Sequence, residues 1–209
     1  DWDCGDVFIG DLLAINFSFE TGDFYGWNKN GDPNRIQVVT NHTGVSGTPY
    51  TAVDGGKFLK LTAGCPGNPS EVWQELYMSA GQVITGYAAF DSGDYIPYND
   101  SAIVVFKADG QQVAMPYYAD VTTVGSYADG PWVEWEFTAP EAGDYLILYS
   151  VVNMSDCSYT SYGLFDGPEY TCTDADGDGQ CDSPSYAGYL DSNGTAGTDT
   201  CGGNADVPN

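Results

Sequence analysis

The chain has 209 residues, of which 42% are hydrophobic and 14% aromatic, and this suffices for one sizeable core. Only 5 Lys and Arg oppose 30 Asp and Glu, so the formal net charge is −25. Such a surface repels phosphate backbones and anionic lipids, which excludes nucleic acid and simple membrane adsorption, and no apolar run is long enough to span a membrane. The acidity favours cations as partners, or else it serves solubility alone.

Short runs of β-branched and aromatic residues, separated by Gly, Pro, Asn and Asp, follow one another from about residue 12 to 166. Each run predicts a strand, at 12–19, 35–40, 57–63, 71–78, 83–90, 101–108, 112–119, 132–139, 144–152 and 161–166. Turn sequences such as "SAGQ", "ADGQ" and "EAGD" lie between them at hairpin spacing, and no segment has ten residues of helical periodicity. The pattern predicts an all-β fold, an antiparallel β-sandwich or jelly roll rather than a parallel sheet.

Composition divides the chain into an N-terminal extension (1–11), the sandwich (12–168) and a tail (169–209). The tail has no Lys or Arg, and its only large aliphatic residues are Leu190 and Val207. Such a composition buries too little apolar surface to order itself. We expect an irregular tail that is held by calcium, by disulfides or by a neighbouring chain.

The tail contains "DADGDGQCD" at residues 174–182. Acids at positions 1, 3 and 5, glycine at 6, a backbone carbonyl at 7 and an acid at 9 match the first half of a calcium loop. The predicted cofactor is therefore Ca²⁺, with the ligands Asp174, Asp176, Asp178, Gln180 and Asp182. Position 12 is Ser185 and no amphipathic helix flanks the loop, which argues against an EF-hand. A solvated acidic linker is the alternative. The spacing and the adjacent cysteine resemble the aspartate-rich calcium repeats of thrombospondin type 3.

Six cysteines occur, at positions 4, 65, 157, 172, 181 and 201, and none belongs to a C-x-x-C pair or a zinc-type cluster. Disulfides therefore fit better than metal, and we expect no free thiol. Cys172 and Cys181 bracket the acidic loop, and closing so short a ring would stabilise the fold by roughly 2.7 kcal/mol. The other pairs, chosen among fifteen possible connectivities, are Cys4 with Cys201 and Cys65 with Cys157.

The chain begins at Asp1 rather than Met, and together with the even number of cysteines this suggests a removed signal peptide and an oxidising, extracellular destination. Five N-x-S/T sequons would be surface acceptors if the host glycosylates, although such short motifs also arise by chance. They are Asn16, Asn41, Asn99, Asn153 and Asn193.

The segment "NFSFETGDFYGW" at 16–27 resembles the opening of secreted jelly-roll domains of the galactose-binding-like class, which includes many carbohydrate-binding modules and bacterial surface proteins. Further segments recur in the family's order, at 53–63, 71–90, 99–106, 142–153 and 161–170, so the resemblance covers roughly residues 12 to 170. It implies two antiparallel sheets packed face to face. It also implies a structural calcium near the join of the first and last strands.

Carried over by position, the ligands of that calcium are Glu20 and Asp166, with Asp54 as a further candidate and carbonyls around Gly22 completing the shell. Glu20 and Asp166 each follow a phenylalanine at the end of a predicted strand, so both could present carboxylate oxygens to one hard cation. The alternative is two ordinary acids at the rim of the sandwich.

Catalysis finds little support in the sequence. The only histidine, His42, lies in a predicted surface loop, and no G-x-S-x-G elbow occurs. The best carboxylate pair, Glu134 and Glu136, shares one solvated strand face. A glycosidase needs one of its two carboxyls in an apolar site, so a glycoside hydrolase is a remote alternative.

Aromatic residues favour carbohydrate binding, since 16 Tyr and 5 Trp exceed what a sandwich core needs. Trp73 and Tyr77 share one face of a predicted strand with Glu71 and Glu75, which is typical of a sugar platform. Loop and edge tyrosines could form its rim, namely Tyr95, Tyr98, Tyr117, Tyr118 and Tyr127. Alternatively, these side chains cover the sandwich ends or face another subunit.

The sequence therefore predicts a secreted, non-enzymatic, calcium-stabilised adhesion module that binds a glycan or copies of itself. In the second case the terminal extensions would add to a neighbour's sheet edge, making the chain a self-assembling structural subunit of an extracellular filament or surface layer. The sequence leaves both possibilities open.

Overall fold

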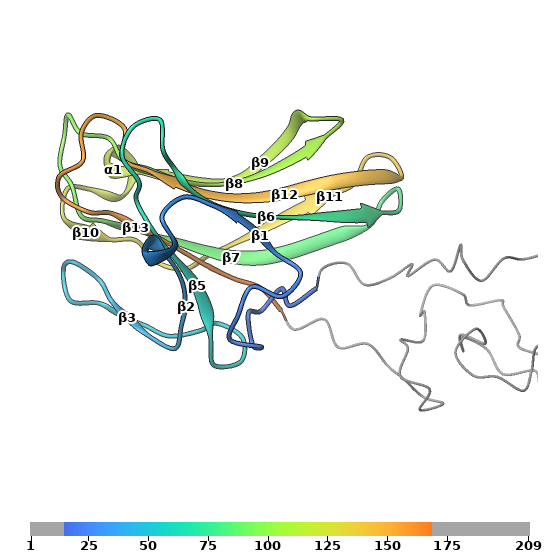
Figure 1. The fold of residues 1–209 in the computed structure, drawn as a ribbon, viewed down its shortest axis with the longest axis horizontal. Coiled ribbons are helices and arrows are strands. Elements are labelled where there is room, and N and C mark those ends of the chain that lie inside the picture. The colour runs from blue at the N-terminus through green and yellow to red at the C-terminus, as the bar shows by residue number, and fades with distance from the viewer. Residues whose placement is uncertain (1–14, 169–209) are drawn as a thin grey trace, which may run out of the picture. The chain divides into compact units, whose positions relative to one another are not determined.

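Two antiparallel sheets stacked face to face form the part of the chain that the computed structural model describes, residues 15–168 (Figure 1). The five-stranded sheet has the order β1–β6–β12–β8–β9, with bounds Asn28–Asn30, Ser70–Met78, Gly143–Val152, Ser101–Ala108 and Gln111–Asp120. The six-stranded sheet has the order β10–β7–β13–β5–β2, with bounds Ala128–Asp129, Val83–Ser92, Tyr162–Asp166, Phe58–Thr62 and Ile36–Val39. In the second sheet β11 (Val133–Thr138) also pairs with β7.

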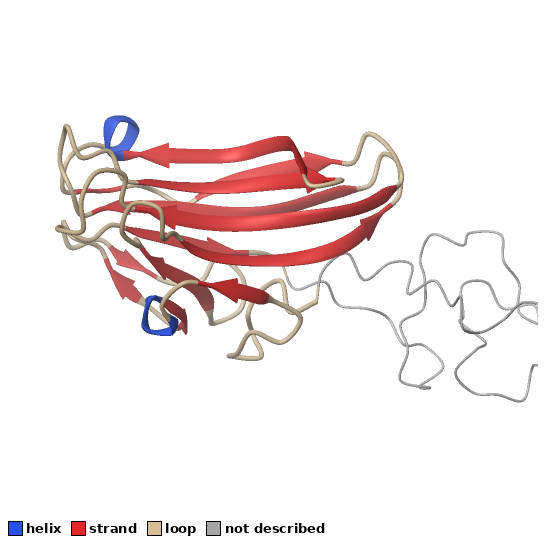
Figure 2. Ribbon diagram, turned by 45° about the horizontal axis from the view of Figure 1, so that its top comes forward, coloured by secondary structure: helices blue, strands red, loops and turns tan. Residues whose placement is uncertain are grey.

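Four small elements complete the fold: the hairpin strands β3 (His42–Thr43) and β4 (Pro49–Tyr50), the 3-10 turn η2 (Pro33–Arg35) and the helix α1 (Val121–Val124). Figure 2 shows the two short helical turns beside the long strands. The predicted antiparallel β-sandwich is confirmed. None of the helices in the described part of the chain has the length and apolarity needed to cross a membrane.

Nine of the ten predicted strands match observed strands to within a few residues, and the exception is the first, 12–19. Residues 15–18 form a turn, in which Asn16 and Phe19 adopt left-handed backbone conformations with φ of 49° and 58°. Phe17 and Phe19 are nevertheless both buried, at 2% and 0% exposure. The alternating spacing of Phe17 and Phe19 is typical of a strand, but here a turn places both rings in the core.

Stacked aromatic rings fill the space between the sheets. Tyr149 on β12 stacks on Phe165 of β13 at a centroid distance of 4.6 Å and on Trp27 at 5.3 Å. Phe106 on β8 stacks on Phe137 of β11 at 4.0 Å. Because successive residues of a strand point to opposite faces, these contacts fix which residues of β8 and β12 point outward.

A second apolar cluster covers the outer face of the six-stranded sheet, where Tyr50, Phe58, Ala89 and Leu164 are buried. The β3–β4 hairpin is held against this face by His42, whose Nε2 lies 2.7 Å from Oδ2 of the fully buried Asp91. His42 therefore belongs to a short strand, and its side chain is only 10% exposed, so the prediction of a surface loop residue was wrong.

A disulfide joins Cys65 and Cys157, whose Cα atoms are 4.8 Å apart, and this predicted pair is confirmed. It connects the loop after β5 with the loop after β12. The other predicted features of the termini lie outside the described residues: Cys4, Cys172, Cys181, Cys201, Asn193 and the acidic loop 174–182.

Candidate functional site

The outer face of the five-stranded sheet carries a row of apolar side chains across its three central strands. Trp73 on β6 pairs in register with Leu148 on β12, which in turn pairs with Val105 on β8. Leu148 and Val105 point away from the core, because their neighbours Tyr149 and Phe106 make the core stacks.

The side chains of this row differ in how far solvent reaches them. Leu148 is only 8% exposed and Val105 only 2%, although both side chains point outward. Longer side chains on the same face therefore shield them. Trp73 at one end of the row is half-buried, so part of its indole ring remains accessible to a ligand.

Polar side chains flank the apolar row on both sides. On one side, the register aligns Glu71 with Ser150, Ile103 and the exposed Tyr118. Asn30 on β1 donates from Nδ2 to Oε2 of Glu71 at 3.2 Å. This side of the row thus carries the Glu71 carboxylate and the exposed Tyr118 beside apolar side chains.

On the other side of the row, Glu75 aligns with Leu146, Lys107 and Gln112. Beyond it Tyr77, which is 50% exposed, pairs with Asp144. The structure thus places the predicted residues Trp73 and Tyr77 on one face of β6, together with both glutamates. The register of β8, β9 and β12 adds residues to this face that the sequence analysis did not assign to it, such as Leu148, Val105 and Lys107.

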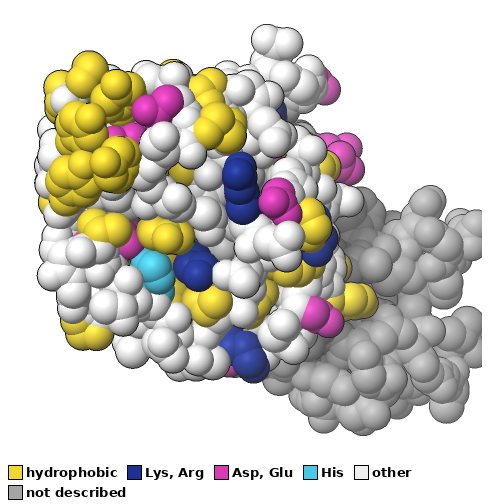
Figure 3. All heavy atoms as spheres, turned by 60° about the vertical axis from the view of Figure 1, so that its left-hand side comes forward, with side chains coloured by type: hydrophobic (Ala, Val, Ile, Leu, Met, Phe, Trp, Pro, Cys, Tyr) yellow, Lys and Arg dark blue, Asp and Glu magenta, His cyan; other side chains and the backbone are white. Residues whose placement is uncertain are grey.

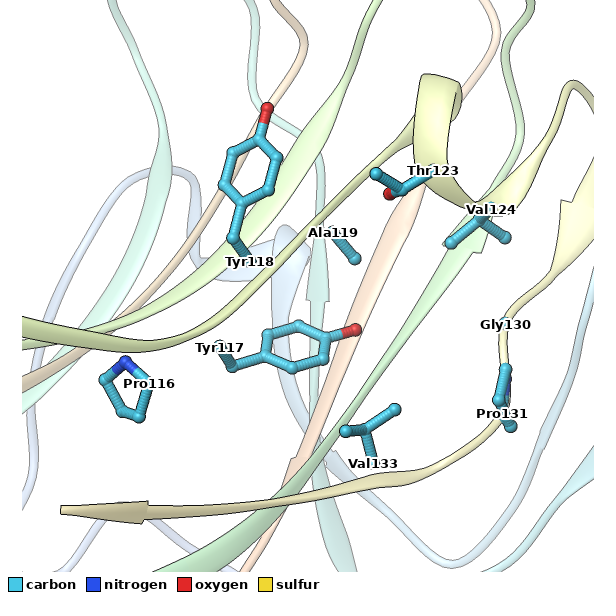
Figure 4. Close-up of a pocket in the computed structure, with 9 residues that line it drawn as sticks. All are labelled: Pro116, Tyr117, Tyr118, Ala119, Thr123, Val124, Gly130, Pro131 and Val133. Atoms are coloured by element: carbon cyan, nitrogen blue, oxygen red, sulfur yellow. The ribbon is translucent and has the colours of Figure 1, made fainter.

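Tyr117 does not belong to this face, and its predicted position at the rim was wrong. It is 6% exposed, and its ring points toward Val133 of β11, into a shallow cavity of about 300 Å³ between the edges of the two sheets (Figure 4). Burial raises the pKa of its hydroxyl. The neighbouring Tyr118 is the exposed one, at 47%, and its hydroxyl donates to Oδ2 of Asp120 at 2.7 Å.

Tyr95 and Tyr98 lie in the loop between β7 and β8, at one end of the sandwich. Their rings contact each other at 5.3 Å, and Tyr95 also contacts Tyr127 at 5.7 Å and Tyr159 at 5.8 Å. These four tyrosines, which we call the tyrosine cluster, are distinct from the face that carries Trp73. The predicted aromatic set is thus divided among three places in the fold: the outer face with Trp73, the cavity with Tyr117, and the tyrosine cluster.

The predicted calcium ligands Glu20, Asp54 and Asp166 meet at the loop 53–57. Oδ2 of Asp166 accepts two backbone N–H bonds of that loop, at 2.7 and 3.1 Å, and Oε1 of Glu20 accepts two more, at 2.8 and 2.7 Å. The Lys57 ammonium donates to the Glu20 carbonyl at 2.7 Å and brings a positive charge of its own. No group of three His, Cys, Asp or Glu side chains converges among the described residues. A calcium ion held by these carboxylates together with backbone carbonyls stays a prediction from the resemblance.

The sequons of the described residues differ in accessibility. Asn41 is exposed and Asn16 and Asn99 are half-buried. Asn153 is only 3% exposed, and its Nδ2 donates to the Ser158 carbonyl at 3.0 Å. At this exposure Asn153 does not lie on the surface as predicted.

The candidate carboxylate pair of β11 is solvent-facing, since Glu134 and Glu136 are both exposed. Trp135 and Phe137, which alternate with them, are 3% and 7% exposed and pack into the core. The strand therefore presents its two acids to water, which is not the apolar environment that raises the pKa of a general acid.

No family model and no curated protein matches the chain. Among solved structures, TmCBM61 in complex with β-1,4-galactotriose is similar at 19% identity and a TM-score of 0.47, over 74% of this chain and 94% of that one. A family 16 carbohydrate-binding module shows 17% identity and a TM-score of 0.44, over 74% and 96% of the two chains. The K3 cleaved adhesin domain of Lys-gingipain from Porphyromonas gingivalis W83 shows 14% identity and a TM-score of 0.48, over 73% of this chain and 95% of that one. At these identities the similarity concerns the β-sandwich fold.

Proposed function

We propose that this protein is a non-catalytic adhesion module that binds carbohydrate on the outer face of its five-stranded sheet. The observation that carries the proposal is the partly exposed Trp73 on the outer face of the sheet, which lies between Glu71 and Glu75 on β6 and pairs in register with the outward-pointing Leu148. Packing between the sheets does not require Trp73, because it lies on the face of β6 opposite to the buried Val72 and Leu76.

The chemistry of this face suits a sugar. A pyranose ring has apolar C–H faces and an edge of hydroxyl groups, so it needs an aromatic or apolar surface below and hydrogen-bonding groups at the sides. Trp73 supplies the first, while Glu71 and Glu75 lie two residues away on either side of it on the same face. Carboxylates accept hydrogen bonds from hydroxyl groups, and they would repel an anionic ligand.

Binding of soluble neutral gluco-, galacto-, manno- and xylo-oligosaccharides, measured by isothermal titration calorimetry, tests the proposal. We expect at least one of them to bind, and Trp73→Ala to weaken that binding by about tenfold or more, which corresponds to roughly 1.4 kcal/mol. Tyr87→Ala is the matched control, because Tyr87 is a half-buried aromatic residue of β7 on the opposite sheet. Binding by none of the four series, or equal losses in both variants, would contradict the proposal.

Secretion is part of the same proposal. The Cys65–Cys157 disulfide supports an oxidising compartment, where such bonds persist. Stabilisation of the tail by calcium at residues 174–182 remains a proposal from the sequence alone, and so does self-association through the terminal extensions.

A further inference from the structure

The tyrosine cluster forms an exposed aromatic surface at the end of the sandwich where β7 leads into β8. Tyr95 lies at its centre and contacts the other three rings, and Tyr127 and Tyr159 contact each other at 6.0 Å. Tyr127 is 45% exposed and Tyr159 57%. Figure 3 shows hydrophobic side chains gathered on this end of the molecule, with acidic side chains among them.

The two exposed tyrosines are held in unfavourable backbone conformations. Tyr127 and Tyr159 both have a φ of 50°, in the left-handed region that costs a residue with a side chain roughly 1–2 kcal/mol. Such conformations persist only where the surrounding structure determines them, and they cluster at binding sites. Here the fold uses them to hold two aromatic rings that remain about half exposed.

A buried carboxylate lies against this surface. Asp94 has no exposed area, and its Oδ1 accepts the backbone N–H of Tyr95 at 2.7 Å. Its Oδ2 is buried and has no hydrogen-bond partner among the described residues. Desolvation, then the charges of the other tyrosines and of Asp94, raise the pKa of the Tyr95 and Tyr127 hydroxyls.

The charge of Asp94 is not balanced within the described part of the chain. Among the described residues, the contact at salt-bridge distance is His42 with Asp91, and Asp94 has no such contact. The acids nearest to Asp94 add negative charge, and both already have partners: Asp100 accepts from Ser161 Oγ at 2.7 Å, and Asp156 accepts from the Ser158 N–H at 2.8 Å. Burial raises the pKa of Asp94, so without a partner its carboxyl group favours the protonated form, and a cationic donor at Oδ2 would hold it ionised.

We propose that the tyrosine cluster binds an organic ammonium cation, with the rings against its apolar shell and Asp94 Oδ2 as its counter-ion. Aromatic faces attract such cations through their quadrupole, and the attraction grows when the cation loses water. The overall charge of −25 favours the approach of any cation. A metal ion fits less well, because calcium takes 6 to 8 oxygen ligands and no three metal-ligating side chains converge in the described residues.

Calorimetry with four probes tests this site independently of the carbohydrate proposal: choline, n-butylammonium, 3,3-dimethyl-1-butanol and CaCl₂. The alcohol has the shape of choline without its charge, so we expect saturable binding of an ammonium and at least tenfold weaker binding of the alcohol. A preference for choline indicates a quaternary ammonium ligand, whereas a preference for n-butylammonium indicates a lysine-like primary one. Equal binding of the alcohol, binding of calcium alone, or no binding of either ammonium would overturn the proposal.

Variants then locate the site. Asp94→Asn keeps the side-chain shape and the acceptor for the Tyr95 N–H, and we expect it to weaken ammonium binding by at least about tenfold. Tyr159→Ala removes the most exposed ring of the cluster and should also weaken binding. Tyr25→Ala is the control, since Tyr25 is 67% exposed and lies outside the cluster. If both cluster variants keep their urea midpoints and bind as the wild type does, the assignment is wrong.

Discussion

Replacing Asp100 with Asn is expected to stabilise the protein at neutral pH and to have little effect near pH 4. Asp100 has no exposed area, and desolvation, with added repulsion from Asp94 and Asp156, raises its pKa to about 6. Its Oδ1 accepts the Met154 N–H at 3.3 Å and its Oδ2 accepts the Ser161 hydroxyl at 2.7 Å. Asparagine fits the same partners, because its oxygen can accept the N–H and its NH₂ group can donate to a rotated hydroxyl.

Whether ionised Asp100 stabilises or destabilises the fold depends on whether the folded or the unfolded state binds its proton more tightly. The folded-state pKa of Asp100 is about 6 against an ordinary value of 3.8, so the folded protein holds the proton more tightly than the unfolded chain. The stability associated with the protonated group is complete below about pH 3.8 and is lost as the pH rises through about 6. The full shift corresponds to about 3 kcal/mol at 1.36 kcal/mol per pKa unit. Solvent screening and relaxation reduce this, so we expect about 1–2 kcal/mol.

Urea unfolding of wild type and Asp100→Asn between pH 4 and 8, in buffers free of organic amines, measures the effect. The free energy of unfolding of the variant minus that of the wild type should rise from near zero at pH 4 to a plateau above pH 7. Asp144→Asn is the control, since Asp144 is exposed on β12, and it should give a small difference at every pH. A pH-independent difference for Asp100→Asn, or one that grows toward low pH, would refute the reasoning.

Two further predictions concern cross-links and calcium. The Cys65–Cys157 bond joins residues 92 positions apart, so Cys65→Ala with Cys157→Ala should lower the free energy of unfolding by about 4–5 kcal/mol on the chain-entropy estimate, and a loss below about 1 kcal/mol would contradict that account. If calcium holds the tail, chelation should lower the melting temperature and make residues 169–209 sensitive to protease, and Asp176→Ala should have the same effect. Cleavage that is unchanged in excess chelator would count against calcium.

The strands were predictable because a period of two in side-chain polarity is a local property of the chain. In β6, Val72, Leu76 and Met78 are buried while Glu75 and Tyr77 are exposed, as the alternation indicates. The prediction of a first strand at 12–19 was wrong because it relied on the same local alternation. Phe17 and Phe19 have the spacing of a strand, but the backbone turns at Asn16 and Phe19, and this depends on contacts such as the bond from Trp27 Nε1 to the Asn16 carbonyl at 3.0 Å.

Where both faces of a strand are apolar, the local sequence pattern does not show which side chains point to the core and which point outward. The sequence "LILYSVV" of β12 does not reveal that Leu148 points outward, and the adjacent Tyr117 and Tyr118 of β9 must face opposite sides without indicating which is buried. Pairing with β8 decides both cases, because its Phe106 is fixed in the core by Phe137 of a different sheet.

By itself, the sequence determined the strand content, the antiparallel sandwich, the acidic surface and the pairing candidates among the cysteines, since each rests on composition or on spacing along the chain. Tertiary structure decided which aromatic residues share a surface. Tyr95, Tyr127 and Tyr159 are 32 residues apart in sequence from one to the next, and closure of three loops at one end of the sandwich brings their rings within 6.0 Å of one another. Contacts between residues so far apart depend on sheet register and loop closure, which no local window of sequence encodes.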